Sequence, residues 1–400
     1  MLLCTSAAIA DDWPRWRGAD HSDQSKETGL LKTWPKSGPK QVWLNKDVGL
    51  GYSSYSIVGG KLYTMGLRGE DEQLIAVDAK SGRELWSITV GGRLKNNWGD
   101  GPRSTPTVDG NDVFAMGGLG SLVCVDRNSG KIKWRVKMTD FGGKKPGWGY
   151  CESVLVDGNA VICTPGGSQG TMLALNRATG SKLWQSAAWK DGAQYASVVP
   201  ARIQGALQYV QLTQKSLAGI NPNSGAVIWK SEWPGRTAVI PTPIIVNNEV
   251  YIASGYGVGS KKVAVGTGGK VSDIWVNKVM KNHHGGVIRV GDYLYGYSDG
   301  RGWICQSWAD GEEVWSERKA VGKGAIAYAD GKFILQDERK GDIVLIEASP
   351  KGWKELGRFQ LSPQTTQRNP KGKIWTHIVV SGGKMFVRDQ ELLFCFDIAG

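Results

Sequence analysis

The sequence has few of the patterns that mark familiar catalytic sites, and nothing that predicts a membrane span. Only four of its 400 residues are histidine, and no stretch approaches the roughly 18 consecutive apolar residues of a spanning helix. Helical periodicity is almost absent, which argues against dinucleotide-binding and kinase chemistry. No Ser-His-Asp order, nucleophile elbow or phosphate-binding loop is present, and the glycines of 255–259 lie in a turn without a following helix.

Cysteine is scarce and is not spaced as a metal or redox motif. Apart from Cys4 near the N-terminus the chain has five cysteines, no two of them adjacent and none in a C-x-x-C pair. We interpret these five as small buried apolar residues. A single disulfide among Cys124, Cys151 and Cys163 is the alternative.

Positively charged residues are in excess and are spread along the sequence. The chain has 49 Lys and Arg against 37 Asp and Glu, a formal net charge of +12. No run of five like charges and no basic helix occurs, so we expect no nucleic-acid partner. A basic surface of this kind favours anionic ligands.

A repeat dominates the rest of the sequence. Segments 76–86, 124–134, 174–184, 219–229 and 305–315 each have a short apolar strand, a polar turn closed by Gly, and a second strand ending in Trp. A left-handed turn residue is most easily glycine. The period of about 40–50 residues in strand-rich sequence is typical of propeller blades. The repeated tryptophans are Trp86, Trp134, Trp184, Trp229, Trp275 and Trp315.

The repeat predicts an all-β, eight-bladed propeller, with seven blades as the second possibility. Seven units begin near residues 52, 103, 150, 194, 237, 283 and 323. An eighth, 375–398, has only three predicted strands, and the isolated strand 39–43 would complete it and remove the open sheet edge. The longer loops 91–101, 141–149, 231–235 and 362–373 all join one blade to the next, so they should share one face.

The residues before the first repeat allow the domain boundaries to be predicted. We expect residues 1–10 to be the remnant of a signal peptide, with Ala8-Ile9-Ala10 resembling a cleavage site and a weak lipidation motif at Cys4. Residues 11–38 should form an arm over the body, and 39–400 one propeller domain. The expected location is the periplasm or the exterior of the cell.

The starts of the innermost strands should direct side chains toward one central mouth. We expect ten ligand-face residues there: Arg103, Tyr150, Glu152, Tyr195, Arg236, His283, His284, Lys323, Trp375 and His377. Their cationic members favour an anionic ligand. Three interpretations stay open: a polar ligand pocket, a solvated funnel, and a metal site of His283 or His284 with His377 and Glu152.

The Trp-terminated hairpins resemble those of the PQQ-repeat β-propeller family, whose pattern is A-x-D-x-x-T-G-x-x-x-W. Ala76, Asp78, Gly82 and Trp86 match it, and 174–184 matches it with Asn at the Asp position. The resemblance extends from residue 39 to the end, and 12–18 and 26–35 are similar to exported PQQ-like proteins. It implies that the tryptophans dock neighbouring blades.

The same resemblance implies two functions. The family includes quinoprotein alcohol dehydrogenases, which use PQQ and calcium, and the non-enzymatic propeller lipoprotein of the outer-membrane β-barrel assembly machine. This chain has neither the adjacent cysteine pair of those dehydrogenases nor an acidic cluster for calcium. We therefore expect a monomeric binding or scaffold module, with a protein, glycan or small anionic ligand. The alternative is a PQQ-dependent oxidoreductase with an atypical site.

Overall fold

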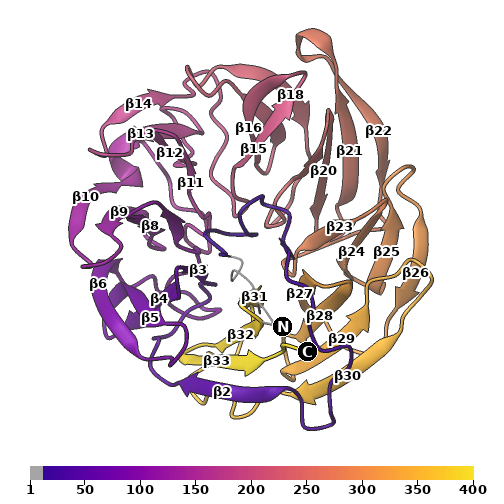
Figure 1. Ribbon diagram of the computed structural model, residues 1–400. Coiled ribbons are helices and arrows are strands. Elements are labelled where there is room, and N and C mark those ends of the chain that lie inside the picture. Colours follow the sequence, from indigo (N-terminus) through magenta and orange to yellow (C-terminus); the bar gives the residue numbers. More distant parts are fainter. Residues whose placement is uncertain (1–11) are drawn as a thin grey trace, which may run out of the picture.

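The computed structural model describes residues 12–400, and these fold into eight antiparallel sheets arranged around a central axis (Figure 1). The eight-bladed prediction is confirmed. Residues 1–10, to which we assigned a signal-peptide remnant, lie outside the described part. No helix in residues 12–400 is long and apolar enough to span a membrane.

Each blade is built from four strands, named here in chain order. Strands of the first four blades are β3 (Ser56–Val58), β4 (Lys61–Arg68), β5 (Asp71–Asp78), β6 (Glu84–Gly92); β7 (Thr107–Asp109), β8 (Asp112–Met116), β9 (Ser121–Asp126), β10 (Ile132–Lys137); β11 (Leu155–Asp157), β12 (Ala160–Cys163), β13 (Leu173–Asn176), β14 (Lys182–Gln185); β15 (Val199–Ile203), β16 (Ala206–Leu212), β17 (Ser216–Ile220) and β18 (Val227–Glu232).

Strands of the remaining blades are β19 (Ile244–Val246), β20 (Glu249–Ser254), β21 (Gly259–Val265), β22 (Val271–Asn277); β23 (Val287–Val290), β24 (Tyr293–Ser298), β25 (Gly302–Ser307), β26 (Glu313–Glu317); β27 (Gly324–Ala329), β28 (Lys332–Asp337), β29 (Asp342–Glu347), β30 (Glu355–Gln360); β31 (Val379–Ser381), β32 (Lys384–Asp389), β33 (Leu392–Asp397) and β2 (Lys40–Asn45). Strand β1 (Gln24–Ser25) adds to β27, and two short 3-10 turns are η1 (Met138–Phe141) and η2 (Thr267–Gly269).

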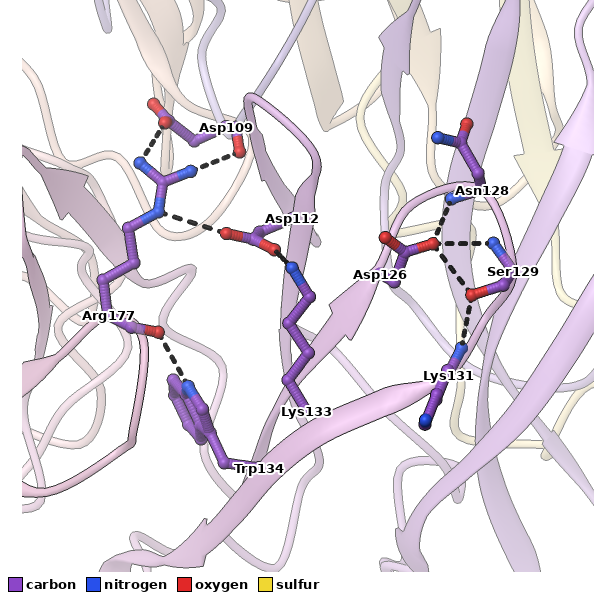
Figure 2. Close-up of polar contacts among 9 residues, drawn as sticks. All are labelled: Asp109, Asp112, Asp126, Asn128, Ser129, Lys131, Lys133, Trp134 and Arg177. Atoms are coloured by element: carbon purple, nitrogen blue, oxygen red, sulfur yellow. Dashed lines mark hydrogen bonds and ion pairs between the residues drawn. The ribbon is translucent and has the colours of Figure 1, made fainter.

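The turn between β9 and β10 explains why the repeated polar sequence forms a hairpin. The Asp126 carboxylate accepts hydrogen bonds from the backbone N–H groups of Asn128 and Ser129 and from the Ser129 hydroxyl (Figure 2). Gly130 follows with φ +74°, a conformation in which a side chain is strained. The Asp, Ser and Gly residues of the repeat therefore recur because they form the hydrogen bonds and the backbone conformation of this turn.

The tryptophan near the start of the outer strand, which continues beyond it and is not ended by it as the repeat predicted, contacts the turn of the following blade. A bulge between Ile132 and Trp134 shifts the register of β10, and Trp134 Nε1 donates to the Arg177 carbonyl at 2.7 Å (Figure 2). A Cβ at Gly180 would lie 2.9 Å from the Trp134 ring, so the turn glycine is required twice, for φ and for space.

Seven of the eight outer strands carry such a tryptophan, β30 being the one that does not, and the same indole-to-carbonyl hydrogen bond recurs among the seven with two exceptions. Trp43, Trp184, Trp275 and Trp315 each donate to a backbone carbonyl of the next blade. Trp229 donates instead to the Gln208 side chain of its own blade. Trp86 Nε1 is buried with no partner among the described residues, although its ring packs on Gly130.

The Arg177 side chain adds a second tie across the same seam. Its guanidinium donates to the Asp109 carboxylate and carbonyl, both at 2.6 Å, and forms an ion pair with Asp112 at 3.2 Å (Figure 2). Asp112 also pairs with Lys133. Blades two and three are thus joined by ring packing and by a charged network at their outer turns.

The last blade takes its outer strand from the N-terminal part of the chain. Strand β2 pairs antiparallel with β33, with Trp43 opposite Cys395 (Figure 1). The predicted closing strand, 39–43, is present as Lys40–Asn45. Arg388 on β32 strengthens this closure from within, because its buried guanidinium donates to carbonyls of the first blade, among them those of Ser53 and Met65.

The segment before β2 crosses one end of the central channel, as the indigo ribbon shows in Figure 1. Trp13 exchanges two backbone hydrogen bonds with Ile57 in blade one, and Pro14 accepts one from Val108 in blade two. Arg17 donates to the Val287 carbonyl in blade six. Because these partners belong to the innermost strands of three blades, the segment lies across the centre of the ring of blades.

Candidate ligand-binding site

The open end of the channel is a mouth formed where the innermost strands begin. Five blades contribute side chains two positions apart, which point to the same side of an extended chain. The cavity encloses about 1180 Å³, its open entrance included, and Trp16 and Arg17 of the N-terminal segment also line it. The paired lining residues are Tyr52 and Ser54, Arg103 and Thr105, Cys151 and Ser153, Tyr195 and Ser197, and Trp375 and His377.

Aromatic rings form one wall of this mouth. Trp98, 42% exposed, lies with its ring centroid 6.3 Å from that of Trp375, and Tyr52 lies 5.0 Å from Trp375 on another side. The Tyr52 hydroxyl donates to the Trp98 carbonyl at 2.6 Å and so holds this loop in place. An exposed indole beside a second one is a surface onto which a flat ring can stack.

His283 belongs to a chain of hydrogen bonds beside this wall, since its ring packs on that of His284, which lies against Trp375. Lys323 Nζ donates to its Nδ1 at 2.8 Å, so the ring proton resides on Nε2 and faces the Tyr256 hydroxyl at 2.9 Å. Lys323 also pairs with Asp299 at 2.7 Å. Burial, together with the charges of His284 and Lys323, lowers the pKa of His283 to about 2, so the imidazole is neutral.

Tyr256 completes this chain in an unusual backbone conformation. Its φ is +55°, which is rare for a bulky residue, and its ring is 39% exposed at the entrance. Such conformations cost free energy and persist where the surroundings hold them. Here the hydroxyl contact with His283 provides part of that support.

His284 forms a separate pair with Glu338. The two side chains approach to 2.6 Å, and Trp375 Nε1 donates to the same carboxylate oxygen at 3.0 Å. Burial acts to raise the pKa of Glu338, but the hydrogen bonds from His284 and Trp375 outweigh it and hold that pKa below its usual value. Glu338 therefore remains a carboxylate that fixes both rings.

His377 lies deeper, against the N-terminal segment. Its Nε2 contacts the His284 carbonyl at 3.2 Å, and its ring packs edge-on against Trp16. Nδ1 is buried without a partner among the described residues, and burial lowers the pKa of His377 to about 3. The neutral imidazole is therefore part of the buried support beneath the cavity, where its Nε2 fixes the backbone of His284.

The structure brings six of the ten expected residues to the mouth and separates the other four from it. Arg103, Tyr195, His283, His284, Trp375 and His377 line the cavity. Lys323 lines an adjacent cavity. Tyr150 and Glu152 are buried behind the wall, where Glu152 accepts hydrogen bonds from Thr164. Arg236 is exposed outside the lining. Ligand binding by any of them stays a prediction.

Sequence reasoning did not find Trp16, Trp98, Trp148 or Tyr256, all of which line the mouth. For two of them a signal existed. Trp98 and Trp148 lie in loops that we expected on one face, and a tryptophan in a polar, glycine-rich loop has no obvious packing role. Arg103, which we expected to attract an anion, donates instead to the Gly99 and Gly101 carbonyls.

The metal and quinone hypotheses can be tested against the residue geometry. In residues 12–400 no group of three or more His, Cys, Asp or Glu side chains is placed to hold a metal ion. His283, His284 and Glu338 are already directed at protein partners. The five cysteines of that range are free, and four of them are buried. In the described residues no cluster of carboxylates is therefore preformed for a calcium ion.

Comparison with known proteins places the fold in context. The model of the family described as outer membrane protein assembly factor BamB matches residues 70–317. BamB from Moraxella catarrhalis is similar in structure, with a TM-score of 0.64 and 16% identity over 90% of this chain and 97% of that one. Among curated protein sequences none is significantly similar to this one.

Two further structures share the architecture. The computationally designed Ika8 protein has a TM-score of 0.64 at 10% identity, over 90% of this chain and all of its own. The quinohemoprotein alcohol dehydrogenase from Comamonas testosteroni has a TM-score of 0.51 at 12% identity, over 99% of this chain and 82% of that one. At these identities the likeness is one of fold.

Proposed function

The chain belongs to the PQQ-like propeller family described as outer membrane protein assembly factor BamB, and on that basis we propose that it is an exported, monomeric binding module. Its ligand is a carbohydrate that enters the mouth on the loop face. The observation that carries the proposal is the pair of indoles Trp98 and Trp375 at the entrance of a cavity that polar aromatic side chains also line.

Sugar recognition needs two kinds of contact, and the mouth has both. The C–H face of a pyranose ring packs on an aromatic ring, and the hydroxyls need donors and acceptors at the ring edge. Trp98 and Trp375 offer the flat surfaces. The residues Tyr256, His283 and His284, which carry a hydroxyl and two imidazoles, border the same space.

The location and the tryptophans are further parts of the proposal. Export to the periplasm or the exterior agrees with the A-x-A segment of the sequence and with the resemblance to exported propellers. We assign the repeated tryptophans a docking role, in which each ring holds the turn of the next blade. The contacts of Trp86, Trp134, Trp184 and Trp275 with the turn glycine of the following blade support that role.

Binding of oligosaccharides tests the main proposal. Isothermal titration with neutral and acidic hexasaccharides should give a dissociation constant between about 1 µM and 1 mM for at least one of them. Trp98→Ala should weaken that binding about tenfold or more. Leu183→Ala, at a 47% exposed rim position, is the matched control and should not. Absence of any heat with both classes of sugar would refute the proposal.

The quinone alternative is tested in the same titration. Pyrroloquinoline quinone, with and without calcium, should give no heat if the mouth is a sugar site. Micromolar quinone binding that Trp98→Ala abolishes would favour the oxidoreductase alternative instead.

Protein binding at the blade rims is a second candidate. The outermost strands expose apolar side chains beside the docking tryptophans, most of all Val276, which is 58% exposed on β22. Exposed strand edges can accept an extended segment of a partner. Ile274→Ser with Val276→Ser should abolish periplasmic cross-linking to such a partner, whereas Trp98→Ala should leave it unchanged.

A further inference from the structure

A second cavity adjoins the mouth, and more cationic than acidic side chains line it. It encloses about 1300 Å³, its open entrance included, and is built by loops of the last three blades. We call it the basic bay. Its charged residues are Arg318, Lys319, Lys323, Arg339, Lys340 and Lys373 on one hand, and Asp299, Asp337 and Glu338 on the other.

The three carboxylates of the bay already form ion pairs or hydrogen bonds with neighbouring groups. Asp299 pairs with Lys323. Asp337 accepts hydrogen bonds from the backbone N–H groups of Gly322, Arg339 and Lys340. Glu338 holds His284 and Trp375. None of the three is directed at the outer cations.

Five cations of the bay are therefore not neutralised by these carboxylates and can attract an anionic ligand. Four are exposed and the fifth is half-buried, and in residues 12–400 their side chains have no ion-pair partner. Like charges gathered around one concavity raise the local concentration of anions. These five cations are Arg318, Lys319, Arg339, Lys340 and Lys373.

The bay and the mouth form one continuous surface. Trp98, His283, His284 and Trp375 line both cavities. The Glu338 carboxylate fixes His284 and Trp375 at the boundary, so the relative position of the stacking surface and the basic surface is held by hydrogen bonds. A ligand stacked on the indoles would extend directly between the cations.

We propose that the ligand is an acidic polysaccharide, with sugar rings on Trp98 and Trp375 and its carboxylate or sulfate groups in the basic bay. This inference rests on the proposed function and narrows the ligand class. The mouth's own guanidinium groups, those of Arg17 and Arg103, are engaged by backbone carbonyls, so the bay is where free positive charge meets the aromatic surface.

The experiment compares oligosaccharides of one length and different charge. Oligogalacturonate and chondroitin sulfate hexasaccharides are titrated against neutral cellohexaose, at about 50 and 300 mM salt. We expect at least one acidic sugar to bind about tenfold or more tightly than the neutral one at low salt, and to lose most of that advantage at high salt, because exposed charges are screened within about 8–10 Å. The preferred acidic sugar identifies the anionic group.

Two triple variants locate the effect. Lys319→Ala, Arg339→Ala and Lys340→Ala together remove three bay cations and should weaken acidic-sugar binding about tenfold. The control removes three exposed lysines elsewhere, Lys182, Lys230 and Lys351, each replaced by Ala, and should change it less than twofold. Equal losses in both variants would overturn the proposal, because net charge alone would then explain binding.

The outcomes separate this inference from the proposed function. Binding of cellohexaose and acidic sugars with equal affinity overturns the inference and keeps the sugar-binding function. Silence with every sugar overturns both. Equally tight, bay-dependent binding of single-stranded oligothymidylate or polyglutamate also overturns the inference, since the bay would then recognise charge without a sugar ring.

Discussion

Replacing Arg388 should open the seam at which the propeller closes. This residue lies on β32 of the last blade, is fully buried, and donates to the carbonyls of Ser53, Met65, Gly49 and its neighbour Gln390, and to the Thr64 hydroxyl. Burial lowers the pKa of Arg388 to about 10, so the guanidinium is still charged at neutral pH. It joins the last blade to the first.

The magnitude follows from the acceptors that would lose their donor. Arg388→Met keeps most of the side-chain volume but leaves four carbonyls without this partner, each costing about 1–3 kcal/mol when buried. Because neighbours and water recover part of this, we expect a total loss of about 4–6 kcal/mol. That is a large share of the roughly 5–15 kcal/mol by which native proteins are stable.

Thermal and urea unfolding of the purified chain would measure this loss. Arg388→Lys should have an intermediate effect, because it keeps the charge and loses the fork of donors. Arg83→Met, at an exposed position, is the control and should change stability by less than about 0.5 kcal/mol. An Arg388→Met protein within about 1 kcal/mol of the parent would refute the view that this side chain secures the closure.

Three other predictions concern the seams, the interior and the mouth. Trp134→Phe should destabilise the chain about 1 kcal/mol more than Trp86→Phe in chemical unfolding, because only Trp134 loses an indole hydrogen bond; equal losses would contradict this. Burial raises the pKa of Glu152 from 4.5 to about 8, so between these pH values the folded state binds a proton that the unfolded state has released. The free energy of unfolding should therefore fall as the pH rises from about 4.5 to about 8. In Glu152→Gln the melting temperature should decrease less over this pH range than in the parent protein. An identical dependence of melting temperature on pH in the two proteins would contradict this prediction. Trp98→Ala should lower oligosaccharide affinity while the melting temperature moves by less than about 2 °C, since the ring is 42% exposed; a large loss of stability would mean that the ring is structural.

The blade count could be predicted because the repeat is local chemistry. The Asp126 and Gly130 positions of the turn and Trp134 after it recur at nearly constant spacing, and each copy forms its hairpin from its own residues. The closing strand could also be inferred, because one predicted strand lacked a blade and one predicted blade lacked a strand.

The sequence indicated where the mouth lies but not all of the residues that line it. The reason is that the sequence does not show which alternate residues at the start of each innermost strand face the central axis. We expected Tyr150 and Glu152 at the cavity, yet Cys151 and Ser153 line it, because neighbouring residues in an extended chain point to opposite sides. The hydrophobic pattern of a strand buried on both faces does not indicate which parity faces the axis.

The sequence by itself determined the class of fold and the number of blades, because these depend on short-range turn chemistry repeated along the chain. Only the tertiary structure decided what the loops make together. Glu338 meets His284, Trp98 meets Trp375, and the bay cations converge from three separate loops. Those contacts join residues far apart in sequence, and their geometry depends on how each blade is rotated and packed against its neighbours.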